Sequence, residues 1–360
     1  MPIQGTYDNF AIDRVVFGKP AAATVAAESA RLGAARVFML FSEPLDRESP
    51  WIDEMRAALG ERFVGSFSAI PPHTPRDAVL EAAEQARSLQ PDLVLTFGGG
   101  SITDAGKMLR LALKHDIRSL DDFDRFVVRV SAEGQRIFPA YDGPEMPQIA
   151  VPTTLAGGDF NSSVGATDPR TKLKEIYLER LLTPRVVVLD PVVTTRTPAW
   201  LFLSSGVRAL DHAIETVCSP AANPRSWLES MEAIRLLTRA LPRVVQNPAD
   251  LDARMDALLA MWLSMERNRF GLIMGASHGI GHVLGGTFDV PHGYTSCVML
   301  PAVLRWTELA NSDRQALVSE AMRQPGRPAW QVVADFIAGL GMPRSLGEVG
   351  IGEADYPRIA

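Results

Sequence analysis

The sequence predicts an α/β domain with a mostly parallel sheet, followed by an all-α domain. Apolar runs of strand length alternate with helical stretches up to about residue 190. A glycine triplet separates one of these runs from the helix that follows it. Beyond Pro198 the pattern changes to long helices with few strand-like runs, so we place the two domains at residues 1–192 and 193–360.

Composition argues against several classes of function and partner. With 360 residues the chain is too long for one small core, and 46% hydrophobic and 22% charged residues are ordinary for a soluble globular protein. The formal charge of −6, without a long basic run, argues against nucleic acid and membrane surfaces as partners. No signal-peptide pattern follows Met1, and Cys218 and Cys297 form no C-x-x-C motif, so we expect a reducing, cytoplasmic location.

Strands separated by helices imply a parallel sheet covered on both faces. We expect strands near residues 14–17, 36–41, 63–67, 91–97, 148–154 and 185–191, and an edge hairpin at 172–176. Expected helices lie near residues 20–33, 50–60, 74–88, 204–218, 223–245, 249–269, 271–284, 293–310, 313–323 and 328–340, and residues 112–146 read as a helix followed by a loop. Thr74 is expected to cap its helix, with Pro75 at the first helical position.

The segment Gly98-Gly99-Gly100-Ser101 directly follows a predicted strand and opens a helix. Glycines allow backbone N–H groups to approach an anion, and the helix N-terminus carries a partial positive charge. Asp104 stands at capping-box spacing from Ser101. The segment is either a pyrophosphate cradle or simply a tight turn between strand and helix, because it matches neither G-x-G-x-x-G nor a Walker A sequence.

Further cofactor candidates follow other strands. Thr153 and Thr154 end one strand, where open α/β sheets bind ligands. Ser42 occupies the place after the second strand where an acidic residue would hold the adenosine ribose, which leaves NADH versus NADPH open. Lys172 and Lys174 could reach a ribose or phosphate, or be solvated surface lysines.

Histidines concentrate in the second half of the chain. His278 and His282 are four residues apart, so a helix places both on one face, and His292 follows a proline that stiffens the approach. Gly285-Gly286 is expected to end that helix. Imidazoles are suited to metal ligation and to proton transfer near neutral pH, although three unrelated core or surface histidines are the alternative. On an earlier helix, Arg208, His212 and Glu215 share one face.

Together these motifs resemble the iron-containing (group III) alcohol dehydrogenase superfamily. The matching pieces, in family order, are Gly98-Gly99-Gly100-Ser101-x-x-Asp104-x-x-Lys107, Pro152-Thr153-Thr154, Leu189-Asp190-Pro191, Gly206-x-x-Ala209-Leu210-x-His212-Ala213-Ile214-Glu215 and the histidines 278, 282 and 292. The resemblance implies a Rossmann-like dinucleotide-binding domain and a helical domain in a dehydroquinate synthase-like architecture. It also implies an NAD- or NADP-dependent oxidoreductase acting on CH–OH or CH=CH groups, and a homodimer.

In the metal-dependent members, one aspartate and three histidines bind a divalent ion such as iron or zinc. The resemblance places His212, His278 and His292 at the histidine positions and His282 at a further active-site histidine. Arg208 stands at the aspartate position, and a guanidinium cannot ligate a metal and repels one nearby. Asp211 points about 100° around the helix from His212, which makes it a poor substitute for the missing aspartate ligand.

One branch of the superfamily, the maleylacetate reductases, also lacks this aspartate and is regarded as metal-independent. Residues 282–292 and His73-x-Pro75 resemble that branch, whereas Leu155-Ala156-Gly157-Gly158-Asp159 and Gly293-Tyr294 depart from its pattern. We therefore expect hydride transfer from a nicotinamide to the carbonyl of a small oxo acid, without a metal. Arg208 would clamp a substrate carboxylate or pair with Glu215 or Asp211, and His282, His278 or His212 would donate a proton.

Three alternatives stay open. The first is a metal-dependent alcohol dehydrogenase that uses the three histidines His212, His278 and His292, with water or Asp211 completing the shell. The second is a dehydroquinate synthase-like lyase, which shares the architecture but has no net consumption of NAD(P)H. The third is a degenerate ligand-binding protein.

Overall fold

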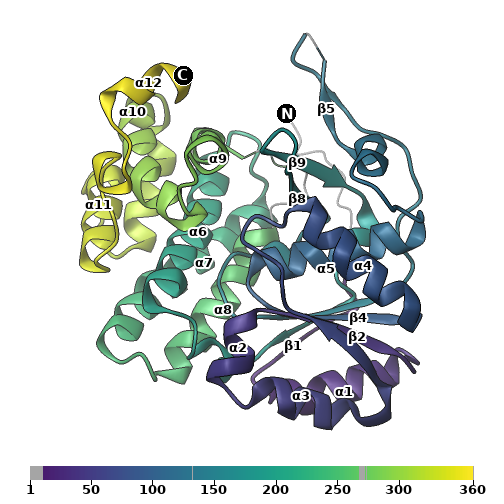
Figure 1. Ribbon diagram of the computed structural model, residues 1–360. Helices are drawn as coiled ribbons and strands as arrows, with labels where there is room; N and C mark the ends of the chain where they lie inside the picture. Colours follow the sequence, from purple (N-terminus) through teal and green to yellow (C-terminus); the bar gives the residue numbers. More distant parts are fainter. Residues whose placement is uncertain (1–10, 132, 267–271, 273, 360) are drawn as a thin grey trace. The chain divides into compact units, whose positions relative to one another are not determined.

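The computed structural model describes residues 11–131, 133–266, 272 and 274–359, which divide into two compact units (Figure 1). The sheet unit contains residues 11–153 and 158–196. The helical unit contains Thr154–Gly157 and residues 197–359.

The main sheet of the sheet unit is entirely parallel. Its strands are β1 (Arg14–Phe17), β2 (Val37–Phe41), β3 (Phe63–Phe67), β4 (Leu93–Gly98), β7 (Gln148–Pro152) and β10 (Val186–Leu189), in the spatial order β1-β10-β7-β4-β2-β3. Every residue of β2, β4, β7 and β10 is buried. Burial on both faces explains why these strands read as continuous apolar runs in the sequence.

Helices cover both faces of this sheet (Figure 1). On one face, α1 (Ala21–Arg31) and α3 (Trp51–Leu59) share a core with alternate residues of β2, including Met39. On the other, α4 (Arg76–Leu89) and α5 (Gly100–Lys114) share a core with Phe38 and Leu40. Successive side chains of the strand point to opposite faces of the sheet, so the same strand contributes to both cores. A short helix, α2 (Glu43–Glu48), follows β2.

Two hairpins lie outside the main sheet. β8 (Ser163–Asp168) and β9 (Leu173–Leu178) pair antiparallel and form a separate two-stranded sheet, which contains the predicted hairpin. Within residues 112–146, where a helix and a loop were expected, α5 ends at Lys114 and a second hairpin joins β5 (Arg129–Val130) to β6 (Arg136–Ile137).

The predicted start of α4 is wrong by one residue. Pro75 is the N-cap residue and Arg76 begins the helix, without a side-chain cap. The Thr74 hydroxyl instead donates a hydrogen bond to the carbonyl of Ser101 (3.0 Å), and the Thr74 carbonyl accepts one from the N–H of Thr167 (3.1 Å). Contacts with other elements have therefore replaced the local capping bond that the sequence favours.

The helical unit is built from α6 (Ala199–Cys218), α7 (Pro224–Gln246), α8 (Leu251–Met265), α9 (Ala276–Phe288), α10 (His292–Ala321), α11 (Ala329–Gly339) and α12 (Tyr356–Ile359). The two helices expected at 293–310 and 313–323 are both present, because α10 consists of two helical segments separated by a kink at the non-helical Asn311 (φ −144°, ψ 28°). An α/β unit followed by an all-helical unit confirms the predicted fold class.

The expectation that Gly285-Gly286 ends the histidine-bearing helix is also wrong. α9 continues through both glycines to Phe288, and the next residue, Asp289, has a left-handed backbone (φ 57°). A Cβ atom on Gly285 would lie 2.9 Å from Nδ1 of His292. The glycine therefore serves the close approach of α10 rather than the end of α9.

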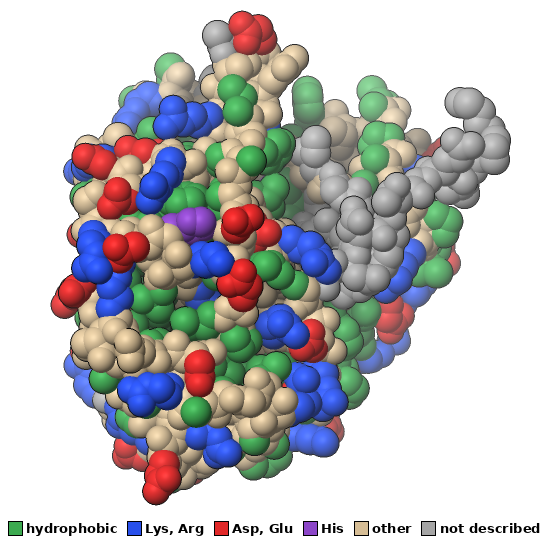
Figure 2. Space-filling model, turned by 90° about the vertical axis from the view of Figure 1, so that its right-hand side faces the viewer, with side chains coloured by type: hydrophobic (Ala, Val, Ile, Leu, Met, Phe, Trp, Pro, Cys, Tyr) green, Lys and Arg blue, Asp and Glu red, His purple; other side chains and the backbone are tan. Residues whose placement is uncertain are grey.

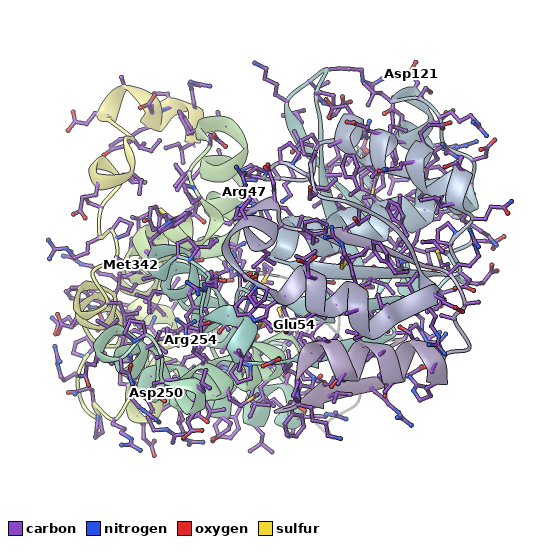
Figure 3. The ribbon with its side chains drawn as sticks, turned by 60° about the horizontal axis from the view of Figure 1, so that its bottom comes forward. Arg47, Glu54, Asp121, Asp250, Arg254 and Met342 are labelled. Atoms are coloured by element: carbon purple, nitrogen blue, oxygen red, sulfur yellow. The ribbon has the colours of Figure 1, made fainter. Side chains whose placement is uncertain are left out.

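Buried charges in the helical unit have partners. Asp250 caps α8 by accepting a hydrogen bond from the N–H of Ala253 (3.0 Å), and Arg254 lies one turn further along (Figure 3). The Arg254 Nε donates to the Pro248 carbonyl (2.7 Å), and its guanidinium lies 4.5 Å from the ring centroid of Phe202. This cation–π contact connects α8 to α6.

Among the helices that the structure describes, none is both long and apolar enough to cross a membrane. On the face shown in Figure 2, acidic and basic side chains are interspersed rather than gathered into a region of one sign.

Candidate active site

The glycine triplet forms the turn between β4 and α5. α5 begins at Gly100 with Gly99 as its N-cap residue, and no side chain caps the helix. The predicted capping box between Ser101 and Asp104 is wrong, because Ser101 lies inside the helix and its hydroxyl accepts the N–H of His73 (3.1 Å). A long helix whose first N–H groups have no side-chain cap fits an anionic group such as a pyrophosphate.

Three predicted cofactor residues meet at the ends of neighbouring strands. The N–H of Ser42 donates to the Phe97 carbonyl (3.1 Å), and the N–H of Thr153 donates to the Gly98 carbonyl (2.9 Å). A Cβ atom on Gly98 would collide with the Ser42 hydroxyl and lie 2.8 Å from Cγ1 of Ile102. Glycine is therefore required at this position, where three parallel strands end at one edge of the sheet.

The other predicted cofactor residues occupy different settings. Asp104 lies on α5 with Oδ1 3.5 Å from Nζ of Lys107. Thr154 is buried in the short stretch that belongs to the helical unit. Lys172 is exposed between β8 and β9 with φ 59°, and Lys174 is half-buried on β9. Cofactor binding by these four residues stays a prediction.

Lys107 holds a loop in place. Its buried ammonium donates to the carbonyls of Gly158 (2.7 Å), Asn161 (2.9 Å) and Ser163 (3.0 Å). Burial lowers the pKa of Lys107, and the neighbouring Asp104 opposes this shift. The side chain therefore fixes the segment between β7 and β8 against α5.

Replacing Lys107 with methionine is expected to destabilise the sheet unit by about 3 kcal/mol or more, because three buried carbonyls lose their donor. Urea denaturation of the full chain measures this effect. Lys114→Met on the same helix is the matched control, since Lys114 pairs with the exposed Glu145 and should cost less than about 1 kcal/mol. Equal effects of the two substitutions would contradict the assigned role of Lys107.

In the helical unit, the four predicted histidines form two pairs. The rings of His212 on α6 and His278 on α9 stack with centroids 4.7 Å apart and planes 25° apart. The rings of His282 on α9 and His292 on α10 meet edge to face at 6.1 Å. His212 and His278 are buried, whereas His282 is exposed and His292 is half-buried. The second pair is thus the more accessible one.

Glu215 of α6 caps α9. Its two carboxylate oxygens accept the N–H groups of Gly275 (2.8 Å) and Ser277 (2.9 Å). Oε2 also lies 2.7 Å from Nδ1 of His278. A Cβ atom on Gly275 would lie 2.5 Å from Glu215 Oε1, so the close cap requires glycine there. A negative charge at this helix end is stabilised by the helix dipole.

Asp211 is fully buried and faces the same region. Its Oδ2 accepts hydrogen bonds from the hydroxyls of Ser277 (2.8 Å) and Ser296 (2.7 Å), and lies 3.4 Å from Nδ1 of His278. Burial, aided by the charge of Glu215, raises the pKa of Asp211 to about 7. Although Asp211 lies about 100° from His212 around α6, its side chain still reaches His278 on α9.

Arg208 belongs to the same network. Its Nη1 donates to the hydroxyl of Ser296 (3.1 Å), which in turn donates to Asp211. Burial lowers the pKa of Arg208, while Asp211 and Glu215 act to raise it. The predicted direct pair with Glu215 or Asp211 is thus not what the structure shows, because Arg208 reaches Asp211 through the Ser296 hydroxyl. The substrate clamp stays a prediction.

Sequence comparison decides the family. Residues 13–191 match the sequence model of iron-containing alcohol dehydrogenases, and residues 202–360 match that of the C-terminal domain of the same family. The chain belongs to the iron-containing alcohol dehydrogenase family. It is therefore an oxidoreductase, and the family implies a nicotinamide cofactor and often a metal ion.

Within this family, the resemblance to maleylacetate reductases is confirmed. The chain is 32% identical to a maleylacetate reductase of Rhizobium sp., covering 96% of this chain and 88% of the relative. The crystal structure of a maleylacetate reductase from Agrobacterium tumefaciens superimposes with a TM-score of 0.82 at 29% identity, covering 99% of this chain and 90% of the other. A 1,3-propanediol oxidoreductase superimposes with a TM-score of 0.87 at 26% identity, covering 98% and 92%.

The family's metal site does not fit this chain. Among the described residues of the histidine site, the donor atoms that lie within 4.8 Å of one another belong to Asp211, Glu215 and His278, and not to the three histidines at the family's ligand positions. Both carboxylates already accept hydrogen bonds, and the guanidinium of Arg208 adds a positive charge beside them. A divalent ion would have to displace these donors and tolerate that cation.

Sequence reasoning missed the two serines and the capping role of Glu215. Ser277 and Ser296 carry no signal of their own, because their partner Asp211 lies 66 and 85 positions away in the sequence. Asp159 was also missed as a partner. Its carboxylate is buried and accepts the hydroxyl of Thr103 (2.6 Å) on α5.

Proposed function

We propose that the protein is an NAD(P)H-dependent reductase that transfers a hydride to the carbonyl of a small, maleylacetate-like oxo acid without a catalytic metal. The observation that carries this proposal is the position of Arg208. A buried guanidinium stands where metal-dependent relatives have an aspartate ligand, and it is tied through Ser296 to Asp211. The similarity to maleylacetate reductases supports the choice of substrate class.

The turn between β4 and α5 supports the cofactor assignment. The uncapped N-terminus of α5 would receive the pyrophosphate, with Ser42 and Thr153 at the ends of the flanking strands. When bound, the reduced nicotinamide supplies the hydride. Ser42 brings no carboxylate to the ribose position.

Hydride addition converts the carbonyl oxygen into an alkoxide, which needs a proton or a hydrogen-bond donor. We assign this role to His282, because it is exposed, whereas His212 and His278 are buried. The ring of His292 meets that of His282 edge to face. Arg208 neutralises the buried carboxylates of Asp211 and Glu215, which lie beside His278, instead of contacting the substrate.

Deuterium transfer tests this function most directly. The full chain is incubated with maleylacetate and NADH or NADPH that carries deuterium at the reactive position. We expect the cofactor to be consumed and the label to appear on a carbon of the product. Label that stays in the cofactor, with turnover but no net oxidation, would instead indicate a redox-neutral lyase.

A further inference from the structure

A single carboxylate joins three helices of the helical unit. Asp211 projects from α6, and its Oδ2 accepts one hydroxyl from α9, that of Ser277, and one from α10, that of Ser296. Arg208, one turn earlier on α6, donates to the same Ser296. A buried carboxylate is tolerated only with such donors and a nearby cation.

The family's ligand positions lie on these same three helices. Positions 208 and 212 are on α6, position 278 is on α9 and position 292 is on α10. A metal held there would join α6, α9 and α10. In this chain the same helices are joined around an anion, and the balancing cation is Arg208 at the former ligand position.

We infer that Asp211, together with Ser277 and Ser296, replaces the metal as the junction of the three helices and so positions the catalytic histidines. This inference rests on the proposed function. Asp211 and the serines are positioning residues, because they act through the helices that carry His282 and His292.

The packing of α9 against α10 agrees with this role. A Cβ atom on Gly281 would lie 2.8 Å from the Thr295 hydroxyl oxygen and 3.5 Å from Nη1 of Arg208, and Gly285 lies equally close to His292. The two helices therefore touch along the face that carries Ser277 and Ser296. A small displacement of either helix would change the contact between His282 and His292.

The test uses Ser277→Ala and Ser296→Ala in the full chain. Ser319→Ala is the matched control, because Ser319 is equally buried on α10 and its hydroxyl donates to the carbonyl of Gln315 on its own helix. Amide hydrogen exchange is measured for each element, and kcat and KM are measured with maleylacetate and the nicotinamide cofactor.

We expect each of the two substitutions to speed exchange in α9 by about tenfold and to lower kcat by about tenfold. Exchange in α7 and α11 and the KM for the nicotinamide should stay at wild-type values. Asp211→Asn should have a larger effect than either serine variant. If the Asp211→Asn protein does not fold, the two serine variants still test whether these residues join the three helices.

Two outcomes would overturn the inference. The first is that the two serine variants show the same amide exchange rates and the same kcat as Ser319→Ala. The other is a stoichiometric divalent ion in the wild type whose removal speeds exchange in α9. A wild type that does not reduce maleylacetate would contradict the proposed function alone, since hydrogen exchange still reports on the junction.

Discussion

Replacing Arg208 with methionine is expected to cost about 3–5 kcal/mol of stability at neutral pH, because it leaves buried carboxylates without their cation. Asp211 is fully buried, and its direct partners are two hydroxyls and a histidine. The kcat should fall by about a hundredfold or more, because the histidine-bearing helices lose their common anchor. Urea denaturation and steady-state kinetics measure the two effects.

The stability loss should depend on pH in a defined direction. The pKa of Asp211 is raised to about 7 in the folded state, whereas that of an unfolded aspartate is about 3.9. The folded protein thus retains a proton that the unfolded chain has lost, so the wild type loses stability as the pH rises from about 4 to about 7. Arg208 opposes the upward shift, so Arg208→Met raises the pKa further. The loss of stability caused by Arg208→Met should then be larger at about pH 8 than at about pH 5.

Arg239→Met provides the control, since Arg239 forms a partly exposed pair with Asp256 on the surface of the helical unit and should cost less than about 1 kcal/mol. If Arg208→Met is as stable and active as this control, Arg208 does not balance the buried charge.

Replacing His282 with phenylalanine is expected to lower kcat by about a hundredfold or more, the usual effect of removing a general acid. His282 is exposed on α9, so the stability should change by less than about 0.5 kcal/mol. The KM for the nicotinamide should stay the same, because His282 is not among the residues to which we assign cofactor binding. Steady-state kinetics and thermal denaturation distinguish the two effects.

The control is His115→Phe. The Nε2 of His115 donates a hydrogen bond to the Asp142 carbonyl (2.8 Å), and both residues belong to the sheet unit. A His282 variant with more than half of the wild-type kcat would show that the proton comes from another group. His292, its ring neighbour, would then be the next residue to test.

The sheet could be predicted because burial determines both its sequence pattern and its structure. Strands β2 and β4 are fully buried and read as uninterrupted apolar runs. Helix ends were less predictable, because long-range contacts decide them. Thr74 donates a hydrogen bond to the Ser101 carbonyl instead of capping α4, and Gly285 leaves room for His292 instead of ending α9.

The candidate site was predicted in its residue types but not in its connections. The four histidines and Arg208 stood out by spacing and by resemblance. The position of Asp211 relative to its own helix was also correct, yet its partners come from α9 and α10. Only the packing of three helices shows that this carboxylate lies at the centre of the site.

Metal content, measured together with activity after chelator treatment, shows whether the enzyme works without a metal ion. The purified full chain is analysed for zinc and iron, treated with a chelator and assayed for NAD(P)H oxidation with maleylacetate. We predict far less than one equivalent of either metal per chain and undiminished activity after treatment. One tightly bound zinc or iron per chain, with activity lost to the chelator and restored by that metal, would contradict the metal-free account.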